Sequence, residues 1–305
     1  MLKLKRYLFI IIITLLTTHG ISGEKRSGDG QEFIVTTEWL SKHLHDKNIV
    51  LIEIGSREDY DKRHLPCAVF METKDISTPR GEGLTLQVPS MEKLIASFEK
   101  AGVSDNSRII LYYGNDWITP TTRFFLTLDY MGFGDKTSIL DGGLPQWLKE
   151  NREVTAKPTI EKRGNIKTAR AHPDIIAGVD YVAQNVDNPA LQIIDARTEN
   201  YYSGADTNYT RPGHIKGATS IPFPSLTTDN EPYLFKSKEE LKKIFDNANP
   251  NNSKNIICYC HIGQQATLVY FIGSYLGYNM KLYDGSYQEW DKKADLPVMG
   301  AVKRK

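Results

Sequence analysis

The chain repeats itself once, and this duplication restricts its possible folds more than any other feature. Near the end of each half, an apolar run is followed by Asp-Gly, a small residue and a tryptophan, at residues 139–147 and again at 282–290. Three further pairs of segments keep the same order: Ser56-Arg57 with Ala196-Arg197, residues 64–68 with 214–218, and residues 109–113 with 256–260. A single period of about half the chain indicates two copies of one domain rather than a solenoid.

Short strand-like runs alternate with helical patterns in each half. Phe124, Leu128 and Met131, for example, are spaced three and four apart after the apolar run at 109–113. This alternation predicts an α/β fold with two tandem domains, each a mainly parallel sheet flanked by helices. In such sheets, the loops that leave the carboxyl ends of strands form the ligand sites.

The polar stretch from about residue 151 to 170 lacks a sustained apolar period and is predicted to link the domains. We therefore place the domains at residues 33–152 and 171–298.

The first 23 residues have the pattern of a secretory signal peptide. Lys5 and Arg6 precede an apolar run over residues 8–16, and small residues follow before Glu24. The run is too short to span a bilayer comfortably. We expect cleavage of residues 1–23, a periplasmic or secreted protein, and no stable membrane insertion afterwards.

The composition is that of a globular protein with few cysteines. Apolar residues make up 40% of the 305 residues and charged residues 25%, with a net charge of +1, which gives no reason to expect a nucleic-acid partner. The three cysteines, Cys67, Cys258 and Cys260, are too few for a disulfide scaffold. Cys258 and Cys260 are expected to point to opposite or offset faces of one strand and to pair poorly. Cys258 is predicted to be buried.

Residues 255–267 read as a strand, a short loop and the start of a helix, with Cys260 at the end of the strand. Gly263 allows a turn with positive φ. The N–H groups that follow, together with the positive end of the helix dipole, would stabilise an anion such as a thiolate or a persulfide. The alternative is that Cys260 is a small apolar residue ending a buried strand.

Three motifs of the second half resemble those of rhodanese-family sulfurtransferases. The loop Cys-His-Ile-Gly-Gln-Gln-Ala-Thr at 260–267 is similar to the active-site loop of that family. Residues 195–197 with 211–218 resemble its early motif, and residues 284–286 with Trp290 resemble its closing one. The motifs keep the order of the family, degenerate copies occur in the first half, and the resemblance covers about residues 33–297.

The resemblance implies a tandem rhodanese architecture in which only the second domain is catalytic. Cys260 would carry sulfane sulfur as a persulfide, from a small anionic donor such as thiosulfate to cyanide or a thiol, without a metal or other cofactor. The substrate-binding residues that it implies are His261, Ile262, Gly263, Gln264, Gln265, Ala266 and Arg197. An arginine after a strand aspartate is also a common structural ion-pair partner, and a loop histidine such as His261 is most often solvated.

The first half offers no cysteine in its equivalent loop, residues 113–117. Gly114 or Asn115 is expected at the place of Cys260, and this half is therefore expected to be structural and to form a wall of the cleft. Cys67 replaces a glycine of the repeat and is predicted to be buried.

The substrate is the least specified part of the prediction. Many thiosulfate-using members of the family carry Arg or Lys in the loop, where this chain has Gln264 and Gln265. Many tandem members have an arginine at the position of Tyr201. Mercaptopyruvate-using members typically have Gly-Ser where His261 and Ile262 stand. A 3-mercaptopyruvate sulfurtransferase and a non-catalytic sulfur- or partner-binding module therefore remain as alternatives.

Two other functions fit less well. A cysteine phosphatase would need an arginine at Ala266 to grip phosphate with two hydrogen bonds. A metal site built on Cys258, Cys260 and His261 would need a fourth, distant ligand.

Overall fold

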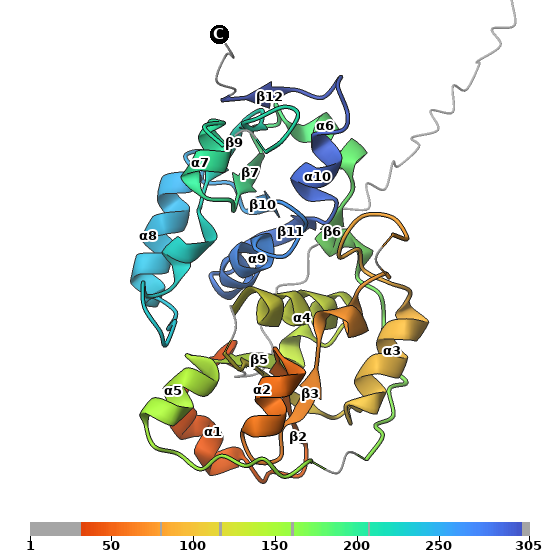
Figure 1. Cartoon of the computed structure of the whole chain (residues 1–305). Helices are drawn as coiled ribbons and strands as arrows, with labels where there is room; N and C mark the ends of the chain where they lie inside the picture. The colour runs from red at the N-terminus through yellow and green to blue at the C-terminus, as the bar shows by residue number, and fades with distance from the viewer. Residues whose placement is uncertain (1–31, 80, 116–117, 160–161, 207, 301–305) are drawn as a thin grey trace, which may run out of the picture.

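The computed structural model describes residues 32–300 except 80, 116–117, 160–161 and 207. The predicted signal peptide, residues 1–23, lies outside the described residues. Two α/β domains follow one another along the chain, the first in the lower half and the second in the upper half of Figure 1.

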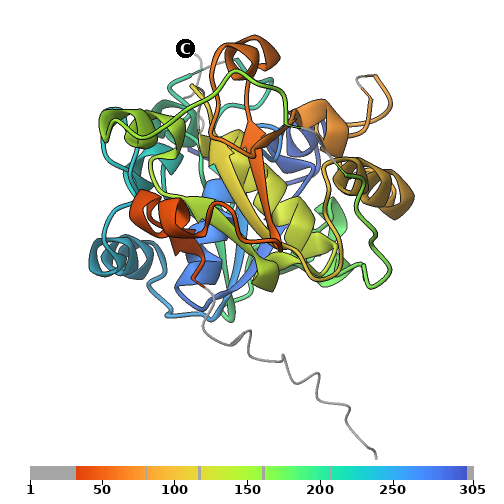
Figure 2. The ribbon, with the colours of Figure 1, turned by 90° about the horizontal axis from the view of Figure 1, so that it is seen from below.

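The first domain is built on a five-stranded sheet in the order β1-β5-β4-β2-β3, and every pair of neighbouring strands is parallel. Helices lie on both sides of this sheet (Figure 2). Its strands are β1 (Ile34–Val35), β2 (Ile49–Ile54), β3 (Val69–Met71), β4 (Arg108–Tyr113) and β5 (Thr137–Leu140). Its helices are α1 (Thr37–His43), α2 (Arg57–Lys62), α3 (Met91–Lys100), α4 (Ile118–Tyr130) and α5 (Gly143–Lys149), with 3-10 turns at Thr73–Ile76 and Gly134–Lys136.

The second domain repeats this topology in the order β6-β11-β10-β7-β9, again with parallel neighbours, and adds an antiparallel pair, β12-β8. Its strands are β6 (Ile176–Ala177), β7 (Leu191–Asp195), β8 (His214–Ile215), β9 (Ala218–Ser220), β10 (Asn255–Tyr259), β11 (Asn279–Tyr283) and β12 (Val298–Met299). Its helices are α6 (Val179–Asn185), α7 (Glu199–Ser203), α8 (Lys238–Ala248), α9 (Ala266–Tyr275) and α10 (Ser286–Trp290), with 3-10 turns at Pro173–Ile175 and Phe223–Leu226. The predicted tandem α/β fold with mainly parallel sheets is confirmed.

The central strands are apolar on both faces because helices cover both faces of each sheet. Along β10, Ile256 and Cys258 face one hydrophobic cluster, whereas Ile257 and Tyr259 face another. β4 shows the same alternation, with Ile109 and Leu111 on one side and Ile110 and Tyr112 on the other. Successive side chains of a strand point to opposite faces, and here each face meets a layer of helices.

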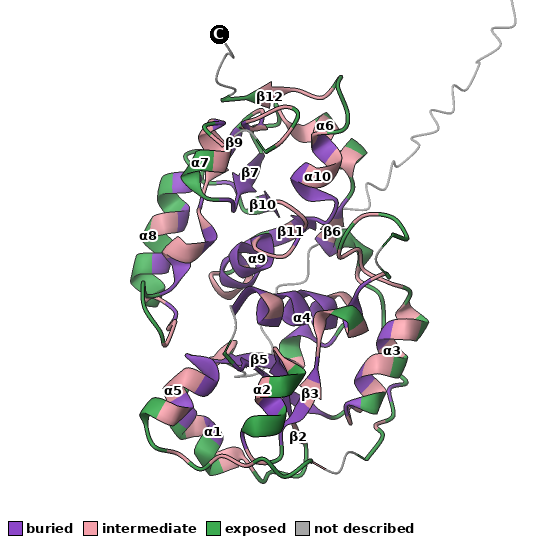
Figure 3. Ribbon diagram, viewed as in Figure 1, coloured by how far each residue is buried: buried purple, intermediate pink, exposed green. Residues whose placement is uncertain are grey.

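One hydrophobic cluster crosses the boundary between the domains. Helices α4 and α9 lie against each other there (Figure 1), and both are buried along most of their length (Figure 3). The rings of Phe125 and Phe271 meet edge to face, with their centroids 4.7 Å apart. The two domains are therefore joined by a shared core as well as by the linker.

No helix in the described part of the chain is both long and apolar enough to cross a membrane.

The structural repeat is defined by a tyrosine that bonds an acidic residue on the neighbouring strand. In the second domain, Tyr259 donates to Asp195 and accepts from the N–H of Ile215. In the first domain, Tyr112 donates to Glu53 and accepts from the N–H of Leu65. The strand registers agree, because Asp195 pairs with Tyr259 and Glu53 pairs with Tyr112.

This register corrects two sequence-based assignments. The residue after Tyr112 is Tyr113, so a tyrosine, and neither Gly114 nor Asn115, takes the place of Cys260. The matching of Ser56-Arg57 with Ala196-Arg197 is wrong by two positions, because Ser56 and Thr198 are the equivalent N-caps of α2 and α7. Insertions and deletions in the loops shift the sequence alignment of the two halves. The register of paired strands is fixed residue by residue and therefore shows which positions are equivalent. The position of Arg197 is therefore taken by Gly55.

Glu53 thus lacks the arginine that accompanies its counterpart, Asp195. Its side chain is fully buried, and Oε1 has no hydrogen-bond partner among the described residues. Burial raises the pKa of Glu53 to about 7, although the hydrogen bond from Tyr112 acts in the opposite direction. A carboxyl group in such a site is held in its neutral form until the pH reaches the neutral range.

We predict that Glu53→Gln changes the pH dependence of stability. As the pH rises from about 4.5 to about 7, Glu53 ionises in the unfolded chain but not in the folded one, so the free energy of unfolding of the wild type falls by up to about 3 kcal/mol. The glutamine variant has no such group and should not show this fall. Urea unfolding at about pH 5 and pH 7.5 should therefore show the stability of the variant increasing relative to that of the wild type as the pH rises. Glu58→Gln, at an exposed position of α2, is the control. The prediction is contradicted if the free energy of unfolding of Glu53→Gln changes with pH in parallel with that of the wild type.

Candidate active site

Cys260 follows the last residue of β10, and helix α9 begins six residues later at Ala266. The predicted order of strand, loop and helix is confirmed. Gly263 has φ +82°, and a Cβ atom at this position would lie 2.9 Å from the carbonyl oxygen of Asp284. Glycine is therefore required for its backbone conformation and also for the close approach of the segment 284–286. We call residues 260–265 the Cys260 loop.

The carbonyl groups of the Cys260 loop are held by donors outside it. Five of these oxygens accept hydrogen bonds of 3.0–3.1 Å. The donors are the N–H of Tyr287 to Cys260, the N–H of Gln288 to His261, Nη1 of Arg123 to Gly263, and the N–H groups of Thr267 and Leu268 to Gln264 and Gln265. The first three come from α10 and α4, and the last two from the first turn of α9.

Peptide planarity determines the direction of the N–H groups. In a trans peptide the C=O and the following N–H point in opposite directions. The N–H groups of residues 261, 262, 264, 265 and 266 therefore point away from the donors that hold the carbonyls. Within the described part of the chain, none of them donates to a protein acceptor. Unused N–H groups between a strand end and a helix start are a typical anion-binding arrangement.

Cys260 itself has no exposed surface, and it belongs to the core cluster that joins the domains. Ser286 Oγ accepts a hydrogen bond from its N–H at 3.2 Å. Burial alone would suit a core residue equally well, so the orientation of the loop peptides is the observation that favours an anion site.

Cys258 is buried, as predicted, and both cysteines are free. Their side chains join the same hydrophobic cluster rather than pointing to opposite or offset faces, because residues two apart along an extended chain share a face. Burial raises the pKa of Cys258 well above its usual value, which keeps its thiol neutral.

Arg197 is a fully buried ion-pair partner of Asp195. Its Nε and Nη2 donate to that carboxylate, and Nη2 also donates to the carbonyl of Gly213. The guanidinium stacks on the ring of Tyr287, 3.9 Å from the centroid. Nη1 has no hydrogen-bond partner among the described residues.

His261 is packed against aromatic side chains, so the expectation of a solvated histidine is wrong. Its Nδ1 lies 2.7 Å from the hydroxyl of Tyr209, and its ring meets Tyr201 edge to face. Burial, together with the charge of nearby Arg197, lowers the pKa of His261 to about 4. The imidazole is therefore neutral at pH 7 and adds no positive charge beside Cys260.

Arg123 is a site residue that the sequence analysis missed. It lies on α4 of the first domain and is 1% exposed. Nη1 donates to the carbonyl of Gly263 at 3.0 Å and to Oδ1 of Asp284 at 2.7 Å, while Nη2 donates to the carbonyl of Leu86. No local pattern in the first domain signals a partner 140 residues away.

Comparison with known proteins agrees with this geometry. The Rhodanese-like domain family matches residues 36–150 and residues 178–293, one match for each domain. The chain belongs to the rhodanese-like family.

The relatives are similar over nearly the whole chain. A Mycobacterium bovis protein provisionally named thiosulfate sulfurtransferase 1 is 29% identical over 88% of this chain and 97% of its own. Thiosulfate/3-mercaptopyruvate sulfurtransferase 2 of Arabidopsis thaliana is 27% identical over 88% of this chain and 87% of its own. The structure of SseA from Escherichia coli, described as a 3-mercaptopyruvate sulfotransferase, is 27% identical, with a TM-score of 0.72 over 84% of this chain and 99% of SseA.

The remaining residues of this rhodanese-like loop differ in their surroundings. Gln264 reaches the first domain, where its Nε2 lies 3.4 Å from Oγ1 of Thr119. Oε1 of Gln265 is buried without a partner among the described residues. Ile262 is half-buried, and Ala266 is buried as the first residue of α9. The two glutamines are uncharged, so neither adds a cation to the loop.

Cys67 is exposed, which corrects the prediction that it is buried. It has φ +65°, close to the +78° of Gly217, the glycine that it replaces in the repeat. Its Sγ lies 3.7 Å from Nδ1 of His45 on the first domain. The side chain is exposed because Cys67 stands in the tight turn at residues 65–68, just before β3.

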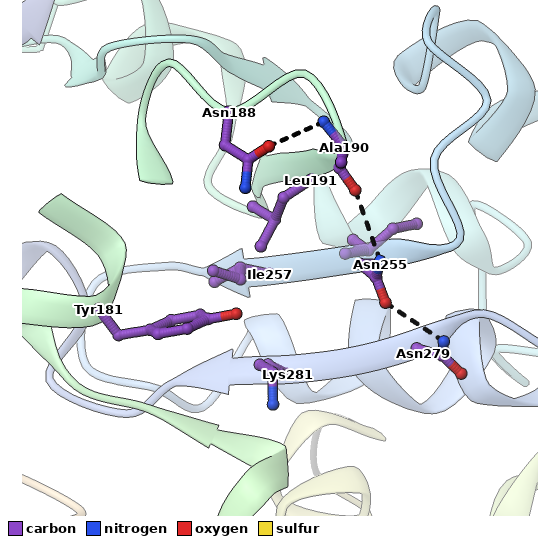
Figure 4. A pocket seen from close by; sticks show the side chains of 9 residues that line it. Tyr181, Asn188, Ala190, Leu191, Asn255, Ile257, Asn279 and Lys281 are labelled. Carbon is purple, nitrogen blue, oxygen red and sulfur yellow. Dashed lines mark hydrogen bonds between the residues drawn. The ribbon is translucent and has the colours of Figure 1, made fainter. Parts of the chain in front are cut away.

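A hollow lies at the opposite ends of the strands from Cys260. It has a volume of about 210 Å³ and opens at the amino ends of β7, β10 and β11 (Figure 4). Its lining is formed by Tyr181, Asn188, Ala190, Leu191, Asn255, Ile256, Ile257, Asn279 and Lys281.

Among the described residues, no cluster of three or more His, Cys, Asp and Glu side chains could hold a metal ion.

We predict that Gly263→Ala is more harmful than Gly277→Ala. Both glycines have φ near +83°, so each alanine costs about 1–2 kcal/mol of backbone strain. A Cβ at Gly277 meets nothing within 4 Å, whereas one at Gly263 meets the Asp284 carbonyl. Thermal unfolding should show the larger loss for Gly263→Ala, and only this variant should alter the reactivity of Cys260. Equal losses and equal reactivity would contradict this reading of the loop.

Proposed function

We propose that the chain is a sulfurtransferase that carries sulfane sulfur on Cys260. The observation that supports this most directly is the orientation of the Cys260 loop, whose carbonyls are bonded outward and whose N–H groups have no protein acceptor among the described residues. A thiolate or a persulfide at the end of β10 would be stabilised by these N–H groups and by the start of α9.

The proposed reaction has two displacement steps and needs no redox partner. The Cys260 thiolate attacks the outer sulfur of thiosulfate, the S–S bond of the donor breaks, and sulfite leaves with the bonding electron pair. The terminal sulfur of the resulting persulfide is then attacked by cyanide or by a thiolate, and Cys260 leaves as the thiolate again. This is covalent catalysis, and ping-pong kinetics are expected.

We assign residues 261–266 to the binding of the transferred sulfur through their backbone N–H groups. Arg197 has a supporting role, because Asp195 and Gly213 engage two of its nitrogens and only Nη1 remains without a protein partner among the described residues. Cys260 is buried, and His261, Ile262 and Gln264 beside it are half-buried.

Thiosulfate is the donor that we propose first, and 3-mercaptopyruvate is the second candidate. The Arabidopsis thaliana relative is named for both donors, and the Escherichia coli structure is described for 3-mercaptopyruvate. The catalytic domain is proposed to span residues 171–298, with residues 33–152 as the domain that lacks the cysteine. Steady-state rates with the two donors at matched concentrations would rank them.

We predict that thiosulfate makes the protein heavier by one sulfur atom and that cyanide removes this sulfur as thiocyanate. Cys260→Ser should abolish both the adduct and the thiocyanate, because hydroxyl cannot form a persulfide. Intact mass spectrometry and a thiocyanate assay measure the two outcomes. Cys67→Ser is the matched control, since Cys67 is exposed on the first domain and should not be needed. A wild-type protein that gives no adduct would instead support a non-catalytic binding module.

We also propose that the chain is exported and that residues 1–23 are removed. The basic start, the short apolar run and the small residues that follow support this proposal. Expression of the full chain with a C-terminal tag should yield a mature form starting near Glu24 in the periplasmic or culture fraction. Replacing Leu15 and Leu16 by arginine should keep the precursor inside the cell. An uncleaved protein in the soluble intracellular fraction would contradict the proposal.

A further inference from the structure

Arg123 belongs to the domain without the cysteine, yet it bonds the Cys260 loop of the other domain. We propose that Arg123 is a positioning residue that keeps the Gly263 carbonyl outward and thereby keeps the N–H of Gln264 turned toward the transferred sulfur. The inference rests on the proposed function and extends it, because it makes the first domain a working part of the site.

The Gly263 carbonyl is held by Arg123 from the first domain, whereas the neighbouring carbonyls are held by donors of the second domain. The carbonyls of Cys260 and His261 are held by backbone N–H groups of α10, and those of Gln264 and Gln265 by the first turn of α9. Only the Gly263 carbonyl is held by a side chain from the first domain among the described residues. Gly263 has no Cβ to restrict rotation of its peptide, so the contact with Arg123 decides its orientation.

The guanidinium is suited to this task because three segments hold it in one place. It contacts the carbonyl of Gly263, the carboxylate of Asp284 and the carbonyl of Leu86, and almost none of its surface is exposed. A hydrogen bond that involves a charged group contributes more than one between neutral groups. If the Gly263 peptide turned over, its carbonyl would point into the anion site and its N–H donor would be lost.

The segment that supports Arg123 also joins the two domains. The N–H of Val88 donates to Oδ2 of Asp284, and the N–H of Thr85 donates to the side chain of Gln288. Leu86, between them, accepts from Arg123 with a positive φ of +63°. The first domain thus contacts the Cys260 loop through α4, and it contacts Asp284 and Gln288 beside that loop through residues 85–88.

A simpler explanation is that Arg123 only neutralises the buried Asp284. Arg123→Met alone would leave that carboxylate without its cation, which is strongly destabilising. The double variant Arg123→Met/Asp284→Asn removes both charges and leaves the Gly263 carbonyl without its donor. It therefore separates neutralisation of Asp284 from positioning of the loop.

The test compares wild type, Arg123→Met, the double variant and Tyr270→Phe, all with Cys67→Ser. Tyr270→Phe is the matched control, because it removes a buried hydrogen bond to Asp129 at the same α4–α9 contact. The rate of Cys260 alkylation by iodoacetamide is followed against pH by peptide mass spectrometry. The loss of thiosulfate is followed under single-turnover conditions, which gives the rate constant of sulfur transfer and the donor concentration at half-saturation. Thermal unfolding shows whether each variant is as stably folded as the wild type.

We expect the double variant to unfold close to the wild-type temperature and yet to alkylate about tenfold more slowly at neutral pH, which is the effect of about one lost hydrogen bond to an anion. The pH midpoint of alkylation should rise, and the transfer rate constant should fall with little change in half-saturation. Tyr270→Phe should keep the wild-type alkylation profile.

The proposal is overturned if the double variant regains the wild-type alkylation profile and transfer rate, since neutralisation would then be the whole role of Arg123. It is also overturned if Tyr270→Phe shifts the alkylation profile as much as the double variant does. A wild-type protein without a persulfide adduct would instead refute the proposed function, and alkylation of Cys260 would still report on the orientation of the loop.

Discussion

The planar trans peptide is the constraint on which the site depends. Each peptide unit carries its C=O and N–H in opposite directions, so a donor that holds a carbonyl on one side directs an amide to the other. Around Cys260, α10, α4 and the first turn of α9 hold five carbonyls in this way. In the proposed site, these amides take the place of a cationic residue in the loop, and the two glutamines at 264 and 265 are compatible with an anion at the end of β10.

The duplicated fold supplies these donors from both copies. The second domain contributes the strand, the loop and the helices α9 and α10, whereas the first contributes Arg123 through α4. The shared core between α4 and α9, with Phe125 against Phe271, keeps that arginine in place. The first domain, which has a tyrosine at the position of Cys260, thus contributes a hydrogen bond to the Cys260 loop.

Charge is compensated differently in the two copies. Asp195 has Arg197 beside it, with three tyrosines around the guanidinium. Among the described residues, Glu53 has only Tyr112 as a hydrogen-bond partner, because Gly55 stands where the arginine would be, and its carboxyl group stays neutral to about pH 7. The same strand position is thus an ion pair in the copy with the cysteine and a buried neutral acid in the copy without it.

The sequence by itself determined the duplication, the parallel α/β fold, the strand–loop–helix context of Cys260 and the positive φ of Gly263, because these follow from periodicity and from local backbone preferences. It did not reveal Arg123, the packing of His261 against Tyr201 and Tyr209, or the exposure of Cys67. Those depend on which segments, far apart along the chain, meet across the domain boundary or at a loop. The repeat register was misjudged by two residues at Arg197 for the same reason, since only the pairing of strands shows where the gaps fall.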